Sequence, residues 1–479
     1  MNNFKDYLEK TGEVGYVKKV FRSICFVEGL PGLHLRETVA FENGALGLAF
    51  SLNENYAEII LLSNSSPIVG ESVARTAHYA SIGLGDYLLG SVIDPLGYIF
   101  SSKQELKIEK SERIDREPIS ILGRREITQP FYTGVKLIDI AVPLGKGQRE
   151  LVIGERKTGK SFFLNHIITN QVKNGVICIY AAIGKRQQDL DIFLNNMLEL
   201  GISSSIVSVI SGAADTPGKI YLTPYTAMTI AEYFRDKGKD VLVILDDMTS
   251  HASYYRELSL EAKRFPGRSS YPGDIFYAHA RIMERAGNFE KGSITCIPVA
   301  DTVMGDLSGY IQTNLMSMTD GHIYFDIDRY NQGLRPAVNP FLSVTRVGLQ
   351  AQSPIVKDVS RQVGSFLVKL ESMKDLMHFG AEAGDQVKQT ISLGDKLMAI
   401  FHQDTRETFP INLTLYLIAL IWGGYGKESQ LHQVEEEYAQ IYKKYLSDQN
   451  FSGEIDKMIM ATPSFADLVS KIKATHYEG

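Results

Sequence analysis

Eight consecutive residues, from Gly154 to Ser161, have the composition and spacing of a phosphate-binding loop. The pattern is glycine, four residues, and then glycine, lysine and serine, and it lies between an apolar run and a helical stretch. The glycines let backbone N–H groups curl around a phosphate, while Lys160 would reach the terminal phosphates and Ser161 would ligate Mg²⁺. We therefore predict a bound nucleotide, contacted by Gly154, Glu155, Arg156, Lys157, Thr158, Gly159, Lys160 and Ser161.

A phosphate loop also needs a carboxylate that holds the metal at the end of another strand. The five apolar residues 241–245 predict a central strand, and Asp246 emerges at its tip. Asp246 would hold the hydration shell of Mg²⁺ through water. The alternative interpretation is an aspartate that only caps the helix after the strand.

Hydrolysis requires a further group that orients or deprotonates the attacking water, usually a carboxylate just after a neighbouring strand. The relevant strand, residues 176–183, is followed by Gly184, Lys185 and Arg186, and the first acid is Asp189, which we expect inside the next helix. Either Lys185 and Arg186 form an ordinary solvated turn, or the site binds nucleotide without cleaving it. Both interpretations leave the chain without an evident general base.

The length and composition of the chain limit the kind of fold that can hold these residues in place. The chain has 479 residues, which suggests about three domains, and its hydrophobic and charged fractions of 44% and 22% exclude disordered and collagen-like chains. With 50 basic and 56 acidic side chains, the net charge is −6, which argues against a protein that coats nucleic acid. The three cysteines, at positions 25, 178 and 296, lie in apolar runs and are expected to be buried thiols of a reducing compartment.

The pattern of apolar residues divides the chain into a multidomain α/β fold of three parts. Short β-rich runs predict an N-terminal β-barrel over residues 1–80, and alternating strands and helices predict a parallel-sheet nucleotide domain over 81–352. Helical periodicity predicts a C-terminal helical bundle over 353–479. Barrel strands are expected at 14–20, 24–27, 37–41, 45–52 and 57–62, and C-terminal helices at 356–377, 381–401, 412–421, 428–446 and 455–459.

No apolar signal core opens the chain, and the longest apolar stretch, residues 415–422, is far shorter than the ~18 residues that suggest a membrane span. We therefore expect a soluble, intracellular protein whose membrane contact is only indirect.

With these motifs, the chain resembles the alpha subunit of F-type rotary ATP synthases over nearly its whole length. The resemblance implies a barrel, a RecA-like nucleotide domain and a helical bundle, in the order already predicted. Besides the phosphate loop, the segments that carry it are 133–134, 143–151, 266–274, 284–286, 305–321, 333–337 and 342–348.

The resemblance also implies a non-catalytic site that binds ATP or ADP with Mg²⁺. The family's catalytic subunit has Gly-Glu-Arg where this chain has Gly184-Lys185-Arg186, which agrees with the missing base. The implied partners are three catalytic beta-like subunits, alternating with three alpha-like subunits around a gamma-like coiled-coil shaft. The implied catalytic residue is Arg346, an arginine finger donated in trans to the neighbouring catalytic site.

Three further residues match family positions near the chain's own nucleotide. Arg335 would approach the adenine or phosphate side, Asp301 matches an acidic residue near the nucleotide, and Gln403 resembles an adenine-contacting glutamine. The segment around Gln403 departs from the family by an apparent one-residue insertion before Pro410, so a polar residue in an interhelical loop is an equal alternative.

Other departures leave the output of the complex open. The family usually has Gln at the position of Lys157 and Gln-Lys-Arg where this chain has Lys185-Arg186-Gln187, so these changes either tighten triphosphate binding or serve loop packing. Barely ten residues precede Thr11, where the family has an arm that docks the ring to the peripheral stalk. The expected output is ATP synthesis and ion transport or, in a specialised motor, motility or other work, at the inner face of a bacterial membrane.

Two alternative functions remain. A self-sufficient homohexameric export ATPase would carry the glutamate that Lys185 replaces. An RNA-translocating ring would need a basic stacking platform in the barrel, and residues 11–77 show none.

Overall fold

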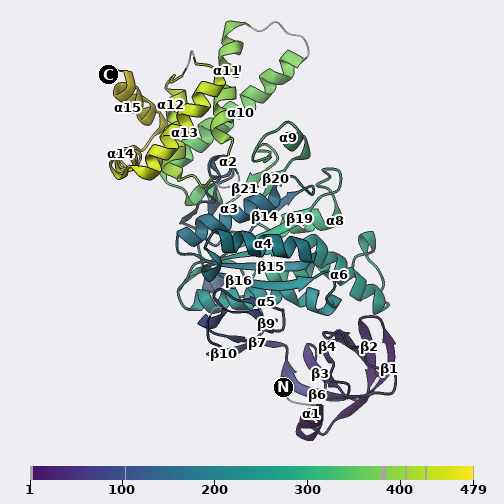
Figure 1. Ribbon diagram of the computed structural model, residues 1–479. Coiled ribbons are helices and arrows are strands. Elements are labelled where there is room, and N and C mark those ends of the chain that lie inside the picture. The colour runs from purple at the N-terminus through teal and green to yellow at the C-terminus, as the bar shows by residue number, and fades with distance from the viewer. Residues whose placement is uncertain (1–3, 103, 379–383, 405–406, 427–428, 478–479) are drawn as a thin grey trace. The chain divides into compact units, whose positions relative to one another are not determined.

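The computed structural model describes residues 4–102, 104–378, 384–404, 407–426 and 429–477 (Figure 1). The chain divides into two compact units, which are described one at a time. The domain boundaries near residues 80 and 352 stay a prediction. The first unit comprises Met1–Arg125, Gly175–Asp301 and Asp306–Thr319, and the second comprises Glu126–Asn174, Thr302–Gly305 and Asp320–Gly479.

A closed antiparallel barrel begins the first unit, with the strand order β1-β2-β5-β4-β3-β6. Its interior is apolar, with Val17, Val39, Phe41 and Ile59 each at most 1% exposed. The five predicted strands are confirmed, whereas β6 and the preceding helix α1 (Phe4–Thr11) were not predicted. The strands are β1 (Val14–Phe21), β2 (Ile24–Glu28), β3 (Glu37–Phe41), β4 (Leu46–Leu52), β5 (Ala57–Leu61) and β6 (Ser72–Tyr79).

The first unit also contains a mainly parallel sheet in the order β19-β17-β15-β16-β8-β9, with β9 antiparallel at its edge. Its central strands are buried along nearly their whole length, which explains their continuous runs of Val, Ile and Leu. The strands are β8 (Val92–Ile93), β9 (Ile99–Ser101), β15 (Ile177–Lys185), β16 (Ile206–Gly212), β17 (Val241–Asp246) and β19 (Ser293–Asp301).

Helices and small strand pairs complete this unit. The helices are α4 (Gln187–Glu199), α5 (Pro217–Asp236), α6 (Met248–Glu261), α7 (Ile275–Met283) and α8 (Tyr310–Met318). The paired strands are β7 (Ser81–Leu84) with β10 (Lys110–Arg113), and β11 (Arg124–Arg125) with β18 (Gly287–Phe289). Short 3₁₀ helices span Asp86–Leu88, Ile121–Gly123, Ser203–Ser205 and Arg268–Ser270.

In the second unit, a buried strand β14 (Glu150–Gly154) leads into helix α3 (Lys160–Lys173). Strand β14 pairs in parallel with β20 (Gly321–Phe325), which pairs antiparallel with β21 (Val344–Thr345). Nearby elements are α2 (Lys136–Ala141), β12 (Pro130–Phe131), β13 (Leu144–Gly145), α9 (Ile327–Asn331) and the 3₁₀ helix Gly348–Ala351.

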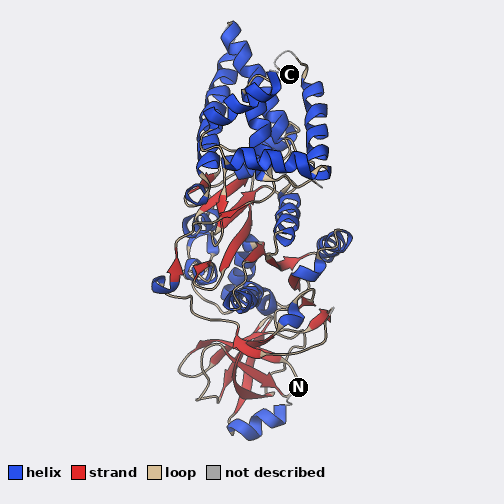
Figure 2. Cartoon of the chain, turned by 90° about the vertical axis from the view of Figure 1, so that its left-hand side faces the viewer, coloured by secondary structure: helices blue, strands red, loops and turns tan. Residues whose placement is uncertain are grey.

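Most of the described C-terminal residues of this unit are helical (Figure 2). Helix α12 is buried at every position from Leu413 to Ile421 and packs against α11, α13, α14 and α15, which makes it the core of the bundle. The predicted helical residues 381–383 and 428 lie outside the described residues. The helices are α10 (Pro354–His378), α11 (Asp385–Phe401), α12 (Ile411–Trp422), α13 (Leu431–Ser447), α14 (Gln449–Met460) and α15 (Phe465–Tyr477), the last of which was not predicted.

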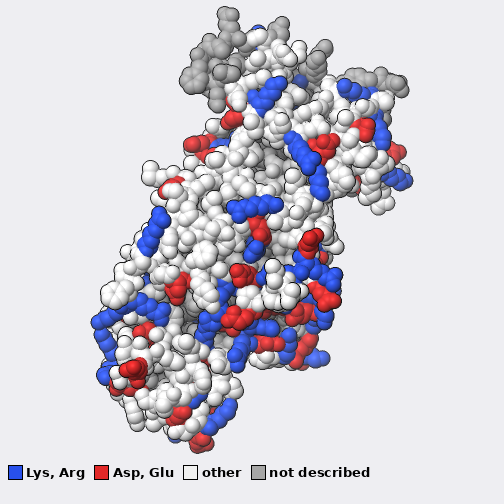
Figure 3. Space-filling model, turned by 180° about the vertical axis from the view of Figure 1, so that it is seen from behind, with Lys and Arg blue, Asp and Glu red and all other residues white. Residues whose placement is uncertain are grey.

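The predicted fold class of barrel, nucleotide-domain sheet and helical bundle is confirmed. All three cysteines are buried free thiols, as predicted, and burial raises the pKa of Cys25 to about 12. None of the described helices has the length and apolar character needed to cross a membrane. On the face drawn in Figure 3, basic and acidic side chains are interspersed, in keeping with the nearly balanced composition.

Candidate functional site

The predicted phosphate loop connects β14 to α3 in the second unit. Gly154 closes the strand where a Cβ atom would lie 2.2 Å from the carbonyl oxygen of Phe325, so only glycine fits against β20. Gly159 has φ +100°, a left-handed conformation that places it at the N-cap of α3. The strand, glycine turn and helix N-terminus therefore stand in the order that a phosphate-binding loop requires.

The loop holds its lysine in a defined position. Nζ of Lys160 donates to the carbonyl oxygens of Gly154 at 2.7 Å and Glu155 at 2.6 Å. The hydroxyl of Thr158 donates to the same Glu155 carbonyl at 2.7 Å. Lys160 and Thr158 are buried, whereas Arg156, Lys157 and Ser161 are exposed. The ammonium of Lys160 is thus positioned by the loop's own backbone, next to the N-terminus of α3.

A cavity of about 90 Å³ adjoins the loop within the same unit. Thr158 and Gly159 form part of its wall, and Arg335 lies in the same wall. The guanidinium of Arg335 lies 3.7 Å from the ring centroid of Tyr330, and its Nη1 donates to the Tyr330 carbonyl at 2.9 Å. Aromatic rings and a fixed arginine beside a phosphate loop suit a planar base carrying phosphates. Other lining residues are Val135, Phe162, Phe163, His166, Phe325, Pro336, Ala337 and Gln403.

Gln403 lines this cavity, but its side chain also holds the backbone together. Its Oε1 accepts from the N–H of Lys136 at 3.1 Å, and its Nε2 donates to the carbonyls of Gly134 at 2.8 Å and Glu407 at 2.6 Å. The residue is 7% exposed. These contacts match the alternative interpretation of a polar residue that fixes an interhelical loop, and contact with adenine stays a prediction.

In the first unit, a cluster of charged side chains lies where β15, β17 and β19 end. Nζ of Lys185, the last residue of β15, lies 2.6 Å from Oδ1 of Asp246 and 3.4 Å from Oδ2 of Asp247. The hydroxyl of Tyr180 donates to Oδ2 of Asp246 at 2.8 Å. Asp301 closes β19, and its charge helps to raise the pKa of Lys185. Both oxygens of Asp246 therefore already accept from other side chains.

Burial and charge oppose each other in this cluster. Burial alone would lower the pKa of Lys185, but the carboxylates of Asp246 and Asp247 outweigh it and raise that pKa above the usual value. The pKa of Asp247 is raised because burial disfavours its charged form more than Lys185 favours it. Lys185 is thus a permanently charged group, and a group of that kind cannot accept a proton from water.

The two consecutive aspartates have different roles. Asp247 is the N-cap of α6 and accepts from the N–H of Ser250 at 2.6 Å, so helix capping belongs to Asp247. Asp246, which the alternative interpretation made a solvated cap, is buried and paired with Lys185. The interpretation of Lys185 as part of a solvated turn is wrong, since its side chain is only 22% exposed, whereas Arg186 is exposed. Asp189 lies in the first turn of α4, as expected.

Arg346 follows β21, and its side chain is exposed. The backbone around it is anchored by two hydrogen bonds. The N–H of Arg346 donates to the carbonyl oxygen of Asp320 at 3.0 Å, and the hydroxyl of Thr345 donates to the carbonyl oxygen of Pro143 at 3.0 Å. A fixed backbone with an exposed guanidinium can present a positive charge to a neighbouring molecule.

Sequence reasoning missed several residues of these sites. Tyr180 sits mid-strand among apolar residues, so nothing in its pattern distinguished it from the core. Lys136 is buried beneath the ring of Phe409, its Nζ 3.8 Å from the centroid, and burial lowers its pKa to about 8. Tyr330 contributes the ring under Arg335. The sequence offered one signal for Tyr330. It lies five residues before Arg335, and a short helix and turn between them can bring the two side chains together.

Comparison with known proteins gives a consistent match. The family model for the ATP synthase alpha/beta family, nucleotide-binding domain, matches residues 134–345. This range includes the phosphate loop, Lys185, Asp246 and Arg335.

Curated relatives match over nearly the whole chain. The ATP synthase subunit alpha of Carsonella ruddii is 33% identical over 455 residues, covering 92% of this chain and 94% of the relative. The protein of the same name from Sulfurovum sp. is 34% identical, with 93% and 92% covered. That from Acholeplasma laidlawii is 37% identical, with 89% and 86% covered.

Proposed function

Because the chain belongs to the family of F-type ATP synthase alpha subunits, we propose that it is a non-catalytic nucleotide-binding subunit of a rotary ATPase ring. In this proposal it alternates with a catalytic beta-like subunit in an alpha3beta3 arrangement around a gamma-like shaft. It binds ATP or ADP at its phosphate loop and donates Arg346 to the catalytic site of the neighbour. Its contact with the membrane is indirect, through the rest of the complex.

The observation that carries the non-catalytic role is the ion pair between Lys185 and Asp246. A hydrolytic site needs a group near the end of this strand that can take a proton from water or orient it. Lys185 stands at this position, and its ammonium is kept charged by two carboxylates. The chain therefore binds nucleotide without the base that would cleave it.

Nucleotide binding is supported by the loop and the adjoining cavity. The phosphates would lie against the N-terminus of α3 with Lys160, and the base would enter the cavity that Arg335 and Tyr330 line. Asp301 and Gln403 belong to the same proposal because both match family positions near the nucleotide, and Gln403 also lines the cavity.

The residues present fit a magnesium ion held mainly by the nucleotide. Mg²⁺ takes oxygen ligands and keeps several waters, and the exposed hydroxyl of Ser161 offers one such oxygen. Asp246 has both oxygens engaged, so its role toward the metal would be indirect, through a water. When bound, Mg²⁺ would neutralise part of the phosphate charge, while Lys160 and the loop N–H groups would orient the phosphates.

The test is made on the isolated full chain. We expect it to bind Mg·ATP, measured by calorimetry, while its turnover stays far below the ~1–10³ s⁻¹ typical of enzymes. A turnover of several per second without a partner subunit would contradict the non-catalytic role. Loss of ATP binding in Lys160→Gln would assign the binding to the phosphate loop.

The work done by the complex is part of the proposal. The motor serves ATP synthesis and ion transport or, in a specialised form, motility or other transport, at the inner face of the membrane. Purification of the native complex, with its subunits identified by mass, distinguishes these outputs. A standard proton channel with a peripheral stalk would reject the specialised motor.

A further inference from the structure

The first unit contains a cavity of about 600 Å³ that the proposed function does not use. Barrel strand β4, helix α5 and the segment 113–117 after β10 all contribute to its wall. Its volume lies within the ~300–1,000 Å³ of small-molecule sites. Segments far apart in the sequence therefore converge on one hollow of ligand size, and no residue of the phosphate loop lines it.

The wall of this cavity carries more basic than acidic side chains. Five arginines line it, at positions 36, 113, 116, 264 and 281, against three carboxylates at 115, 117 and 274. The carboxylates are already engaged. Asp115 accepts from Arg36 at 2.5 Å and from Arg281 at 2.7 Å, and Asp274 accepts from the hydroxyl of Tyr255 at 2.8 Å.

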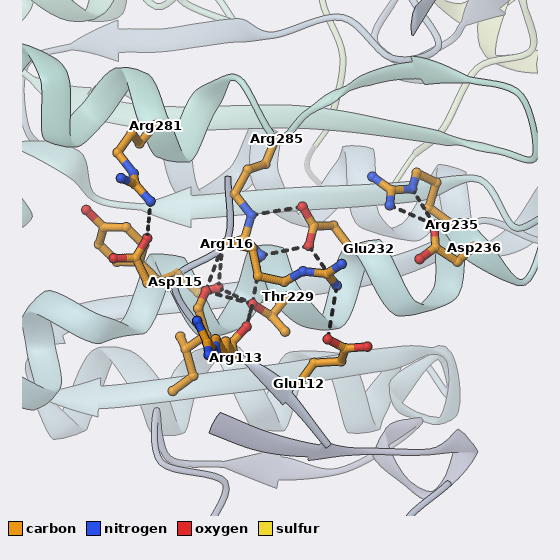
Figure 4. Close-up of polar contacts among 12 residues, drawn as sticks. Glu112, Arg113, Asp115, Arg116, Thr229, Glu232, Arg235, Asp236, Arg281 and Arg285 are labelled. Atoms are coloured by element: carbon orange, nitrogen blue, oxygen red, sulfur yellow. Dashed lines mark hydrogen bonds and ion pairs between the residues drawn. The ribbon is translucent and has the colours of Figure 1, made fainter. Parts of the chain in front are cut away.

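Further ion pairs with residues outside the cavity lining hold this wall in place. Nη1 of Arg116 lies 3.5 Å from Oε2 of Glu232, and Nη2 of Arg285 lies 2.9 Å from the same oxygen (Figure 4). Figure 4 shows Arg281 reaching Asp115 in the same view. The arginines are thus ordered by protein contacts, so the site is formed before any ligand arrives.

One guanidinium on the wall, that of Arg113, has no anionic partner among the described residues. The guanidinium of Arg113 lies 3.6 Å from the ring centroid of Tyr79 and forms no ion pair there. The guanidinium of Arg281 differs, because it lies 2.7 Å from Asp115 and 3.0 Å from Glu117, and these two carboxylates balance its charge. The positive charge that an incoming anion would meet on this wall is therefore that of Arg113.

The rest of the wall presents aromatic rings. Phe50 packs edge-on against Tyr221 and Tyr255, with ring centroids 6.4 Å and 6.1 Å apart. Tyr221 and Tyr255 stack on each other at 5.3 Å. Arg264 covers another side of Phe50, 4.0 Å from its centroid. Such rings bind planar aromatic groups through stacking and edge contacts.

We propose that this cavity is a second ligand site, for a small organic anion that carries a planar ring. The anionic group binds at Arg113, and the ring packs among Phe50, Tyr79 and Tyr221. The site is independent of the nucleotide at the phosphate loop, so its ligand links the barrel to the nucleotide domain without entering the phosphate site.

Phenyl phosphate is a suitable probe because it joins one ring to one anion. The full chain, with ATP present to fill the phosphate loop, should bind one phenyl phosphate with a Kd of about 1 mM or tighter by calorimetry. Inorganic phosphate and phenol, each with half of the recognised chemistry, should bind at least about tenfold more weakly. Equal affinity for phosphate alone, or no saturable binding at about 10 mM, would overturn the proposal.

Variants locate the binding. Arg113→Gln should weaken the binding of phenyl phosphate at least about fivefold. Because Arg113 is exposed and has no ion pair with another described residue, the fold should persist. Phe50→Leu should weaken phenyl phosphate but leave inorganic phosphate unchanged. The matched control is Arg125→Gln, which removes the same charge from an arginine that is 62% exposed and outside the wall. Unchanged affinity in Arg113→Gln would refute the site.

Discussion

Nζ of Lys185 lies 2.6 Å from Oδ1 of Asp246, so the carboxylate at the end of β17 is neutralised by a side chain of the neighbouring strand. Tyr180 donates to the other oxygen of Asp246 at 2.8 Å. The strand ends that would position a base and a metal in a hydrolytic site are here joined to each other. The same contact therefore bears on stability as well as on chemistry.

The first prediction concerns the stability that Lys185 provides. Lys185→Ala leaves Asp246 and Asp247 without their cation, and breaking a buried pair is unfavourable by ~3–5 kcal/mol. Since Lys185 is 22% exposed, we expect a smaller loss of about 2–3 kcal/mol in the free energy of unfolding, measured with urea. The double variant Lys185→Ala with Asp246→Asn should recover part of it. Arg186→Ala, in an exposed pair one residue away, should change stability by less than about 0.5 kcal/mol.

The second prediction concerns Arg346 in the assembled ring. Arg346→Ala should lower ATPase turnover by about 10³–10⁵, because an arginine finger stabilises charge on the transferred phosphoryl group. Arg346→Lys should restore only part, since an ammonium lacks the planar fork of guanidinium. Subunit composition, measured by native mass spectrometry, should stay the same in both variants. Normal turnover in Arg346→Ala would exclude the donated arginine.

The third prediction compares two lysines of the phosphate loop. Lys160 is buried and fixed by two carbonyls, whereas Lys157 is exposed on the same loop. Lys160→Gln should weaken ATP binding about 10- to 100-fold, the value of one or two charge-assisted hydrogen bonds. Lys157→Gln removes the same charge and should change the Kd less than about threefold. Equal losses in the two variants would show that charge, and not the position of Lys160, determines affinity.

The fourth prediction concerns acid stability. Burial lowers the pKa of His251 from 6.5 to about 4, and His251 shares a 3.1 Å hydrogen bond with His279. Between these pH values the unfolded chain binds a proton that the folded chain does not, so His251 makes stability fall as pH falls from 6.5 toward 4. This contribution amounts to about 2 kcal/mol between pH 7 and pH 5.

His251→Gln keeps a donor for the Tyr221 carbonyl and an acceptor for His279 without titrating. The loss of stability between pH 7 and pH 5, measured by urea unfolding at each pH, should therefore shrink in this variant. The exposed His432→Gln serves as the control and should keep the wild-type difference. An unchanged difference in His251→Gln would show that the buried imidazole does not drive acid unfolding.

Much of the fold could be predicted because its local patterns agree with its packing. The strands beside the site are buried on both faces, so they appear as unbroken apolar runs, and the phosphate loop has a fixed spacing. Strand β6 was missed because Arg75 and Thr76 interrupt its apolar pattern, and the partners of Arg75 are Glu13 and Glu37, which lie far from it in the sequence. Helix α1 does have helical spacing, with apolar or aromatic side chains at Phe4, Tyr7 and Leu8, but its eight residues are shorter than the window of about 11–18 residues over which such a pattern predicts a helix.

The site itself was only partly predictable. That Asp246 and Lys185 end neighbouring strands follows from the sequence pattern, but their contact depends on the register between β15 and β17. The division of roles between Asp246 and Asp247 depends on where α6 begins. The hydrogen bonds of Gln403 join residues 267 and 269 positions apart, and no local pattern encodes such pairs.

The closed barrel has a consequence for assembly. Every one of its six strands is hydrogen-bonded on both sides, so β1 meets β6 and no strand edge is left for another chain to extend. Barrels of this kind can meet one another only through side chains. Recognition between neighbours in a ring then depends on surface complementarity, which can tell one kind of subunit from another, whereas backbone pairing would join any two copies and propagate without limit.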